Sequence, residues 1–254
     1  MIKTSKEKIK NILNGFDIKQ DSYLILHTSL FVLGQIEGGI KTIYDLIIKK
    51  YATEGTVIVP TFTYSFRRKQ IFNVNNSVSD PEVGVFPEFL RKQKKSYRNL
   101  DPLFSFSSIG KDKDIILRQK KNCFGKNSIF EKLFSKNAKI LSIGVEFTHG
   151  ITEFMHIEKL ANVFYRYERT FTGHIIDHNK KKFKDKAIHF VKNERIFKKY
   201  QSDRENFGQK LIKKGICKTL KYGYGNIFTI DTNNFLEFTY DALKKKPDVM
   251  LKKI

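Results

Sequence analysis

The chain has 254 residues, of which 40% are hydrophobic, and a formal net charge of +22 at pH 7. That length can bury a sizeable core, and the composition excludes a disordered or fibrous chain. Residues 1–10 carry four lysines and no apolar run, and no segment approaches the roughly 18 apolar residues that span a bilayer, so we expect a cytoplasmic protein without membrane insertion.

The first predicted unit is a strand, a turn, a helix and a second strand. Residues 23–26 form a short apolar run, and residues 40–51 carry an apolar stripe at helical spacing. The second strand lies in residues 56–60 and is followed by a turn rich in hydroxyl groups. Because this arrangement puts both turns at one edge of a sheet, residues 27–39 form either a ligand cradle or an ordinary loop.

A second strand and helix pair is predicted further along the chain. Residues 139–143 are apolar enough for a buried strand, and residues 151–161 have helical spacing. Residues 172–176 and 187–191 form a hairpin around a lysine-rich turn. Residues 203–215 and 231–246 are predicted helices, and residues 216–222 and 226–230 are strands between them.

Several blocks of the sequence resemble the aminoglycoside 3-N-acetyltransferase family. They occur in the family's order over roughly residues 20–175: HTSL with a following GG, GTVIVPTFTY, DPEVG, RNLDP with SFSSIG, and FGKNS. The resemblance implies an α/β fold of three layers, α/β/α, with a central mixed sheet, unlike the histone-acetyltransferase type. It implies a single acyltransferase domain over residues 1–254, with a core in 1–172 and a smaller supporting lobe in 173–254.

The resemblance also implies that acetyl-CoA, or another short acyl-CoA, is the co-substrate. The thioester arm would lie along the turn after the first strand, with two residues of the FGKNS block closing over it. The predicted donor residues are His27, Thr28, Ser29, Leu30, Gly38, Gly39, Phe124 and Ser128. We expect no metal, because no two histidines have a convincing set of partner ligands. Cys123 adjoins the last block, where it is either a thiol near the site or a buried structural residue.

In the related family a T-xx-H-xx-E pattern closes the site, and its histidine is the general base toward the acceptor amine. Thr152, His156 and Glu158 resemble this pattern, but His156 follows Thr152 by four positions and precedes Glu158 by only two. Glu153 is therefore a competing partner for His156, and Glu146 is a third. His149 takes the role if the register differs by half a helical turn, and Thr152 is alternatively a plain helix cap.

The acceptor is predicted from charge and from aromatic side chains. We expect Tyr64, Glu82, Tyr165 and Arg166 to bind it, although Tyr165 and Tyr167 also fit a strand that exposes alternate residues. A strongly basic chain attracts anions and repels polycations. The sequence therefore favours a nucleotide-linked amino sugar of surface-polysaccharide synthesis as acceptor over an aminoglycoside, unless the lysine content only reflects codon usage.

The same charge raises a different class, a protein that binds single-stranded nucleic acid. The basic runs at residues 180–184 and 244–246 lack any known reader motif, and such runs are usually solvated turns or helix ends. We therefore expect small-molecule partners and do not favour nucleic acid. The sequence leaves a monomer and a homodimer open.

Overall fold

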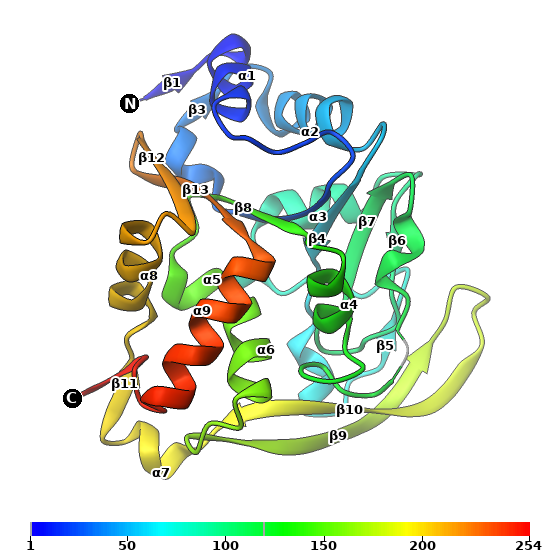
Figure 1. Ribbon diagram of the computed structural model, residues 1–254. Coiled ribbons are helices and arrows are strands. Elements are labelled where there is room, and N and C mark those ends of the chain that lie inside the picture. The colour runs from blue at the N-terminus through cyan, green and yellow to red at the C-terminus, as the bar shows by residue number, and fades with distance from the viewer. Residues whose placement is uncertain (1, 119) are drawn as a thin grey trace.

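The computed structural model describes residues 2–118 and 120–254, and a mixed seven-stranded sheet lies at its centre (Figure 1). The strands of this sheet are β2 (Tyr23–Thr28), β4 (Thr56–Pro60), β6 (Tyr97–Arg98), β7 (Phe106–Gly110), β8 (Lys139–Ile143), β12 (Cys217–Tyr222) and β13 (Gly225–Asp231). Their order is β12-β13-β8-β2-β4-β7-β6. The three central strands, β8, β2 and β4, run parallel, and antiparallel pairs extend the sheet on both sides.

Helices cover both faces of the sheet. Consecutive side chains of β2 point to opposite faces, so Leu24 and Leu26 belong to one apolar core while Ile25 belongs to the other. The first core contains side chains of α1 (Lys6–Asn14), α2 (Gly39–Tyr51) and α3 (Val85–Arg91); the second contains those of α4 (Ile129–Ser135), α5 (Phe147–Gly150), α6 (Glu153–Leu160), α8 (Arg204–Lys213) and α9 (Thr232–Lys245). This confirms the predicted three-layer α/β fold with a central mixed sheet. Over the described residues, no helix is both long enough and apolar enough to cross a bilayer.

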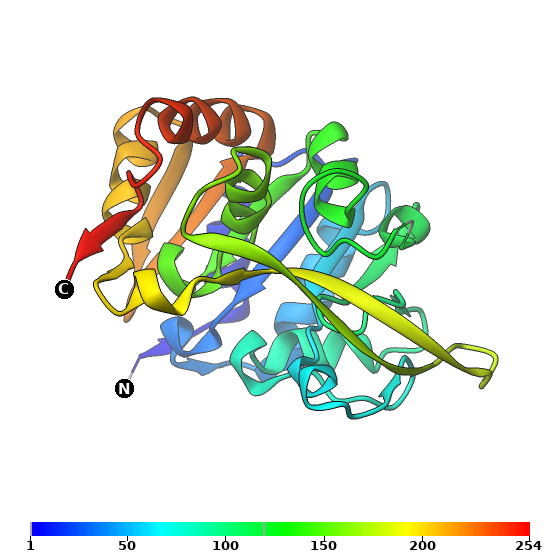
Figure 2. The same ribbon diagram turned by 90° about the horizontal axis from the view of Figure 1, so that it is seen from below.

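A long hairpin forms a second, three-stranded sheet. Its strands β9 (Arg166–Ile176) and β10 (Lys182–Lys192) pair along their whole length, and β5 (Phe72–Asn73) joins β9 in parallel. Figure 2 shows the hairpin as a twisted ribbon that runs across the molecule, with its tip on the side away from the C-terminus. Lys180, in the turn, has a φ of 63°. The hairpin predicted around the lysine-rich run is therefore present, and it is longer than its apolar segments indicated.

The remaining elements are short. They are β1 (Lys3–Thr4) paired with β3 (Gln35–Ile36), β11 (Tyr200–Ser202) paired with β14 (Leu251–Lys253), α7 (Glu194–Phe197), and the 3₁₀ helices η1 (Leu30–Leu33), η2 (Tyr64–Arg68), η3 (Pro81–Val83) and η4 (Lys113–Ile116).

The C-terminal segment, predicted as a supporting lobe, contributes strands to the central sheet. Residues Ile227 to Asp231 of β13 pair antiparallel with residues Lys139 to Ile143 of β8. The helix α9 then packs against α6, whose Phe154 ring lies 4.8 Å from that of Phe235. The last third of the chain therefore completes the sheet and fixes the position of α6.

Candidate functional site

The carboxyl ends of the three parallel strands meet at one edge of the sheet. The backbone amide of Ser29, directly after β2, donates to the carbonyl of Ile143 at the end of β8, with N and O 2.7 Å apart. Gly84 has a φ of +91°, and a Cβ added there would lie 2.7 Å from the carbonyl oxygen of Thr28. Only glycine suits this close approach, which brings the loop after β4 against the end of β2.

A cavity of about 1280 Å³ has walls from segments far apart in sequence. It is lined by η2 and the loop before η3, by the α5–α6 segment, by the base of the hairpin, and by the segment from β11 into α8. The polar and sulfur-containing side chains that line it include Tyr64, Arg67, Arg68, Asp80, Glu82, Thr148, His149, Thr152, Met155, Arg166, Tyr167, Arg169, His189, Lys192, Glu194, Asp203, Arg204 and Glu205. A cavity of this size, with charges of both signs, can hold a sugar-sized polar ligand.

Three of the four predicted acceptor residues line this cavity: Tyr64, Glu82 and Arg166. The fourth, Tyr165, is buried and donates its hydroxyl to Glu158 Oε1, with the two oxygens 3.2 Å apart. Its neighbour Tyr167 is exposed and lines the cavity instead. Alternation does not account for this difference, because residues two apart in a strand point to the same face. Tyr165 precedes β9, which begins at Arg166.

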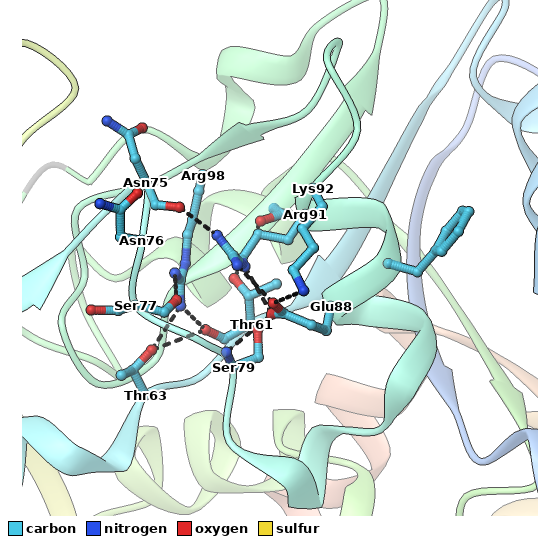
Figure 3. Close-up of polar contacts among 12 residues, drawn as sticks. Thr61, Thr63, Asn75, Asn76, Ser77, Ser79, Glu88, Arg91, Lys92 and Arg98 are labelled. Carbon is cyan, nitrogen blue, oxygen red and sulfur yellow. Dashed lines mark hydrogen bonds and ion pairs between the residues drawn. The ribbon is translucent and has the colours of Figure 1, made fainter.

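Buried Arg98 holds the segment that leads to Asp80 and to Glu82 of η3, through the contacts drawn in Figure 3. The Arg98 guanidinium donates to the carbonyl of Thr61 at 2.6 Å, to Thr63 Oγ1 at 2.7 Å and to the carbonyl of Ser77 at 2.5 Å. One side chain thus joins the end of β4 to the segment before Asp80. This side of the cavity wall is therefore held from behind.

The predicted base, His156, is buried away from the cavity. The amide of Gly125 donates to its Nδ1 at 3.1 Å, and its ring packs on those of Phe134 and Phe130, with centroids 4.9 and 6.0 Å away. Burial lowers the pKa of His156 to about 3. The ring is therefore neutral at ordinary pH and fills an aromatic core.

The structure does not bring the three predicted catalytic residues together. Glu158 Oε2 lies 2.6 Å from Arg166 Nε and 2.7 Å from Arg204 Nη2, and Glu153 Oε1 lies 3.0 Å from His27 Nε2. The two arginines lower the pKa of Glu158 against the opposing effect of burial. Because residues two apart on a helix point ~200° apart, Glu158 and His156 leave α6 in opposite directions.

The helical face that meets the cavity carries Thr152 and Met155. Thr152, Met155 and Glu158 are spaced by three residues each, as the threonine, histidine and glutamate are in the T-xx-H-xx-E pattern. The middle position of that pattern is thus occupied by Met155, whose thioether cannot accept a proton from an amine. By its spacing from Thr152 and Glu158, position 155 and not position 156 corresponds to the histidine of the family pattern.

An imidazole is nonetheless present on the cavity wall, at His149 of α5. Glu205, from the first turn of α8, accepts from the amide of Phe147 at 3.1 Å and also lines the cavity. Burial, and then the charge of Glu146, raises the pKa of Glu205, while His149 acts in the opposite direction. His149 and Glu205 thus both line the cavity. The sequence offered His149 only as a substitute and did not indicate Glu205.

The predicted donor residues lie elsewhere on the structure. His27 and Thr28 are buried at the end of β2, Ser29 and Leu30 form the turn into η1, and Gly38 and Gly39 begin α2 with positive φ. Phe124 packs among aromatic rings, and Ser128 caps α4 by accepting from the amide of Glu131. In the part of the chain that the structure describes, none of these eight residues lines the 1280 Å³ cavity.

Comparison with known proteins agrees with this architecture. A sequence model of the family described as "Aminoglycoside 3-N-acetyltransferase" matches residues 25–244. The SPbeta prophage-derived aminoglycoside N(3')-acetyltransferase-like protein YokD of Bacillus subtilis is 24% identical over 56% of this chain; the match spans only 61% of that protein's length.

Solved structures share the fold over nearly the whole chain. AAC-IIIb in a binary complex with CoASH superposes with a TM-score of 0.81 at 16% identity, covering 96% of this chain and 97% of the other. AAC-VIa with bound sisomicin gives a TM-score of 0.83 at 17% identity, covering 96% and 98%. The chain belongs to the aminoglycoside 3-N-acetyltransferase family, and the predicted enzyme class, an N-acetyltransferase that uses acetyl-CoA, is the class of that family.

Proposed function

We propose that this protein transfers the acetyl group of acetyl-CoA to an amine of an amino sugar, and that an aminoglycoside is the acceptor class best supported. The family match over residues 25–244 carries the proposal. The acceptor side is supported by carboxylates on the cavity wall, among them Asp80, Glu82 and Glu205. Carboxylates beside Tyr64 suit the ammonium groups and the ring of an aminoglycoside.

The reaction requires one proton to leave the acceptor. The amine nitrogen forms a bond to the thioester carbonyl carbon, the C–S bond breaks, and the proton lost by the amine compensates the thiolate that leaves. We place His149 as the group that accepts this proton, with Glu205 beside it, because His149 lines the cavity and His156 is enclosed by phenylalanines.

Direct transfer within a ternary complex needs no nucleophile from the protein. Cys123 is buried, and burial raises the pKa of its thiol well above the usual value. A thiol held neutral in this way is a poor nucleophile, because the thiolate is the reactive form. This supports direct attack by the amine rather than an acetylated cysteine.

A nucleotide-linked amino sugar is the second candidate acceptor. It is favoured by the net charge of +22 and by the basic side chains on the cavity wall, which include Arg67, Arg166, Arg169 and Arg204. Such a field concentrates anions and opposes the approach of polycations. The two candidates therefore differ in the sign of the charge that the acceptor brings.

Thiol release from acetyl-CoA distinguishes the candidates. The protein is assayed with a sisomicin-type aminoglycoside, with a uridine-diphosphate-linked amino sugar, and without acceptor. Saturable turnover of the aminoglycoside, confirmed by a mass increase of one acetyl group, is the expected result. Turnover of the nucleotide-linked sugar alone would select the second candidate, and no acceptor-dependent thiol release with any amino sugar would reject the proposal.

A further inference from the structure

Three nitrogen-containing side chains on the cavity wall are more than nine-tenths buried. Arg166 is 8% exposed, Arg204 is 6% exposed and His189 is 6% exposed. They come from the start of β9, the start of α8 and the end of β10. Since guanidinium and imidazole groups are rarely this buried without partners, their contacts determine what else the cavity can bind.

The two arginines share one carboxylate. Glu158 Oε2 is 2.6 Å from Arg166 Nε and 2.7 Å from Arg204 Nη2, while its Oε1 accepts from the Tyr165 hydroxyl. Arg166 Nη1 also donates to the carbonyl of Phe190 at 3.2 Å. Over the described residues, no other carboxylate lies within 4.0 Å of either guanidinium. The cluster therefore carries two positive charges against one negative charge.

A further cation adds to this excess. Lys192 lines the same cavity, and burial together with the charges of Arg166 and Arg204 lowers the pKa of its ammonium group. Two other carboxylates on the wall have different partners: Glu205 accepts from the amide of Phe147, and Asp203 faces Lys252. Burying positive charge that no anion balances is costly, so the cluster favours an external anion.

Buried nitrogen atoms without a hydrogen-bond partner also favour an external anion. Arg204 Nε and both ring nitrogens of His189 are buried without a hydrogen-bond partner in the described part of the chain, whereas Arg166 Nε is paired with Glu158. The His189 ring lies among aromatic rings, with centroids 4.8 Å from Phe104 and 6.4 Å from Phe171. Its neutral form has one N–H to donate, and a guanidinium offers a planar fork of donors that matches phosphate or carboxylate oxygens.

We propose that Arg204, Arg166 and His189 form a subsite for an oxyanion, a phosphate or carboxylate group carried by the acceptor. The assignment to the acceptor rests on the proposed acetyl transfer; the binding of an anion does not. An acceptor that carries such a group would place its amine near His149 and its anion at this cluster. The subsite would thus extend the acceptor range from the aminoglycosides proposed above to amino sugars that also carry an anionic group.

Calorimetric titration of the full chain with inorganic pyrophosphate tests the subsite without requiring turnover. We expect Arg204→Gln to weaken pyrophosphate binding roughly tenfold or more, as loss of a bidentate contact should. The matched control is Arg169→Gln, which removes the same charge from an exposed position on the same cavity wall. Equal losses in the two variants, or no pyrophosphate binding by the folded wild type, would overturn the subsite.

A second variant covers the case in which Arg204→Gln fails to fold. His189→Phe keeps an aromatic ring among Phe104, Phe124 and Phe171 and removes only the ring nitrogens. A loss of about threefold or more in pyrophosphate affinity is expected from one hydrogen bond, and unchanged affinity would exclude His189.

Inhibition kinetics identify which substrate carries the anion. Pyrophosphate competitive with the acceptor supports the assignment, whereas pyrophosphate competitive with acetyl-CoA would move the subsite to the donor's phosphates and overturn it. If Arg204-dependent binding is found but no acetyl transfer occurs with any amino sugar, the subsite stands and the proposed function fails.

Discussion

His27 at the end of β2 and Glu153 at the start of α6 form a buried pair, with Nε2 and Oε1 3.0 Å apart. The two residues are separated by 126 positions in sequence. The contact ties the central strand of the sheet to the helix that presents Thr152 and Met155 to the cavity. The pair therefore holds this part of the cavity wall in place against the core.

Breaking this pair should destabilise the protein. We expect His27→Ala and Glu153→Gln each to lower the free energy of unfolding by about 1–3 kcal/mol, because each leaves a buried polar partner unsatisfied. The double variant should cost less than the sum of the two single losses. Denaturant unfolding of the four proteins measures the coupling, and strictly additive losses would mean that the contact contributes nothing.

Removing the His149 imidazole from the cavity wall should impair turnover. We expect His149→Ala to lower kcat roughly a hundredfold or more at neutral pH, in the range of a lost general base, with little change in the KM for acetyl-CoA. The comparison variant is His156→Gln, which should keep most of its activity. If His156→Gln loses as much activity as His149→Ala, the base lies in α6 after all.

A histidine placed on the cavity face of α6 should restore part of that loss. In the His149→Ala background, Met155→His puts an imidazole three residues from both Thr152 and Glu158, and we expect kcat to rise about tenfold. Met155→Leu, which stays apolar, should give no recovery. The readout is the pH profile of kcat, in which the restored limb should follow the titration of the new imidazole.

Stability should fall in mild acid because of His156. Its folded pKa is lowered to about 3 from an ordinary value of 6.5. Between these values the unfolded chain binds a proton that the folded chain excludes, so the free energy of unfolding decreases as pH falls, by up to about 1.4 kcal/mol per pH unit.

Denaturant unfolding at several pH values between 6.5 and 3 tests this slope. His156→Gln should reduce it and still accept from the amide of Gly125. His174→Gln, at an exposed position of β9, should leave it unchanged. An identical pH dependence for wild type and His156→Gln would refute the assignment.

Gly208 sets the contact between α8 and α5. A Cβ added there would lie 2.3 Å from Phe147 Cδ2, and Phe147 is itself held by stacking on Phe228 with centroids 4.5 Å apart. We expect Gly208→Ala to lower stability by about 1–3 kcal/mol despite the better helix propensity of alanine. Lys210→Ala, exposed on the same helix, should be nearly neutral, and thermal unfolding compares the two.

The local pattern of apolar and charged residues predicted several elements of the fold. The apolar run before His27, the helical stripe after Gly39 and the lysine-rich turn at residues 180–184 correspond to β2, α2 and the β9–β10 hairpin. Side-chain periodicity reports which face of an element is buried, so these elements could be placed from the sequence. Residues 65–138 carried family blocks but no clear periodicity, and their short strands and 3₁₀ helices emerged only with the structure.

Some of the residues that line the cavity were also predicted from the sequence. Tyr64, Glu82 and Arg166 were predicted as acceptor residues, and all three line the cavity. Glu158 and Arg204 were not connected by the sequence, because they are 46 positions apart and meet only when α8 packs beside α6. The direction of each side chain on α6 depends on a rotation of 100° per residue, so an error of one position exchanges the cavity face for the aromatic core.

By itself, the sequence determined several strands and helices through periodicity and the basic character of the chain through composition. The order of its blocks indicated the family, and the resemblance to that family implied the layers of the fold. Tertiary structure alone decided which histidines reach the cavity and which charges share one carboxylate. The reason is that burial and pairing depend on neighbours brought together from distant segments, and it is these neighbours that determine whether an imidazole or a guanidinium is enclosed or free to bind a ligand.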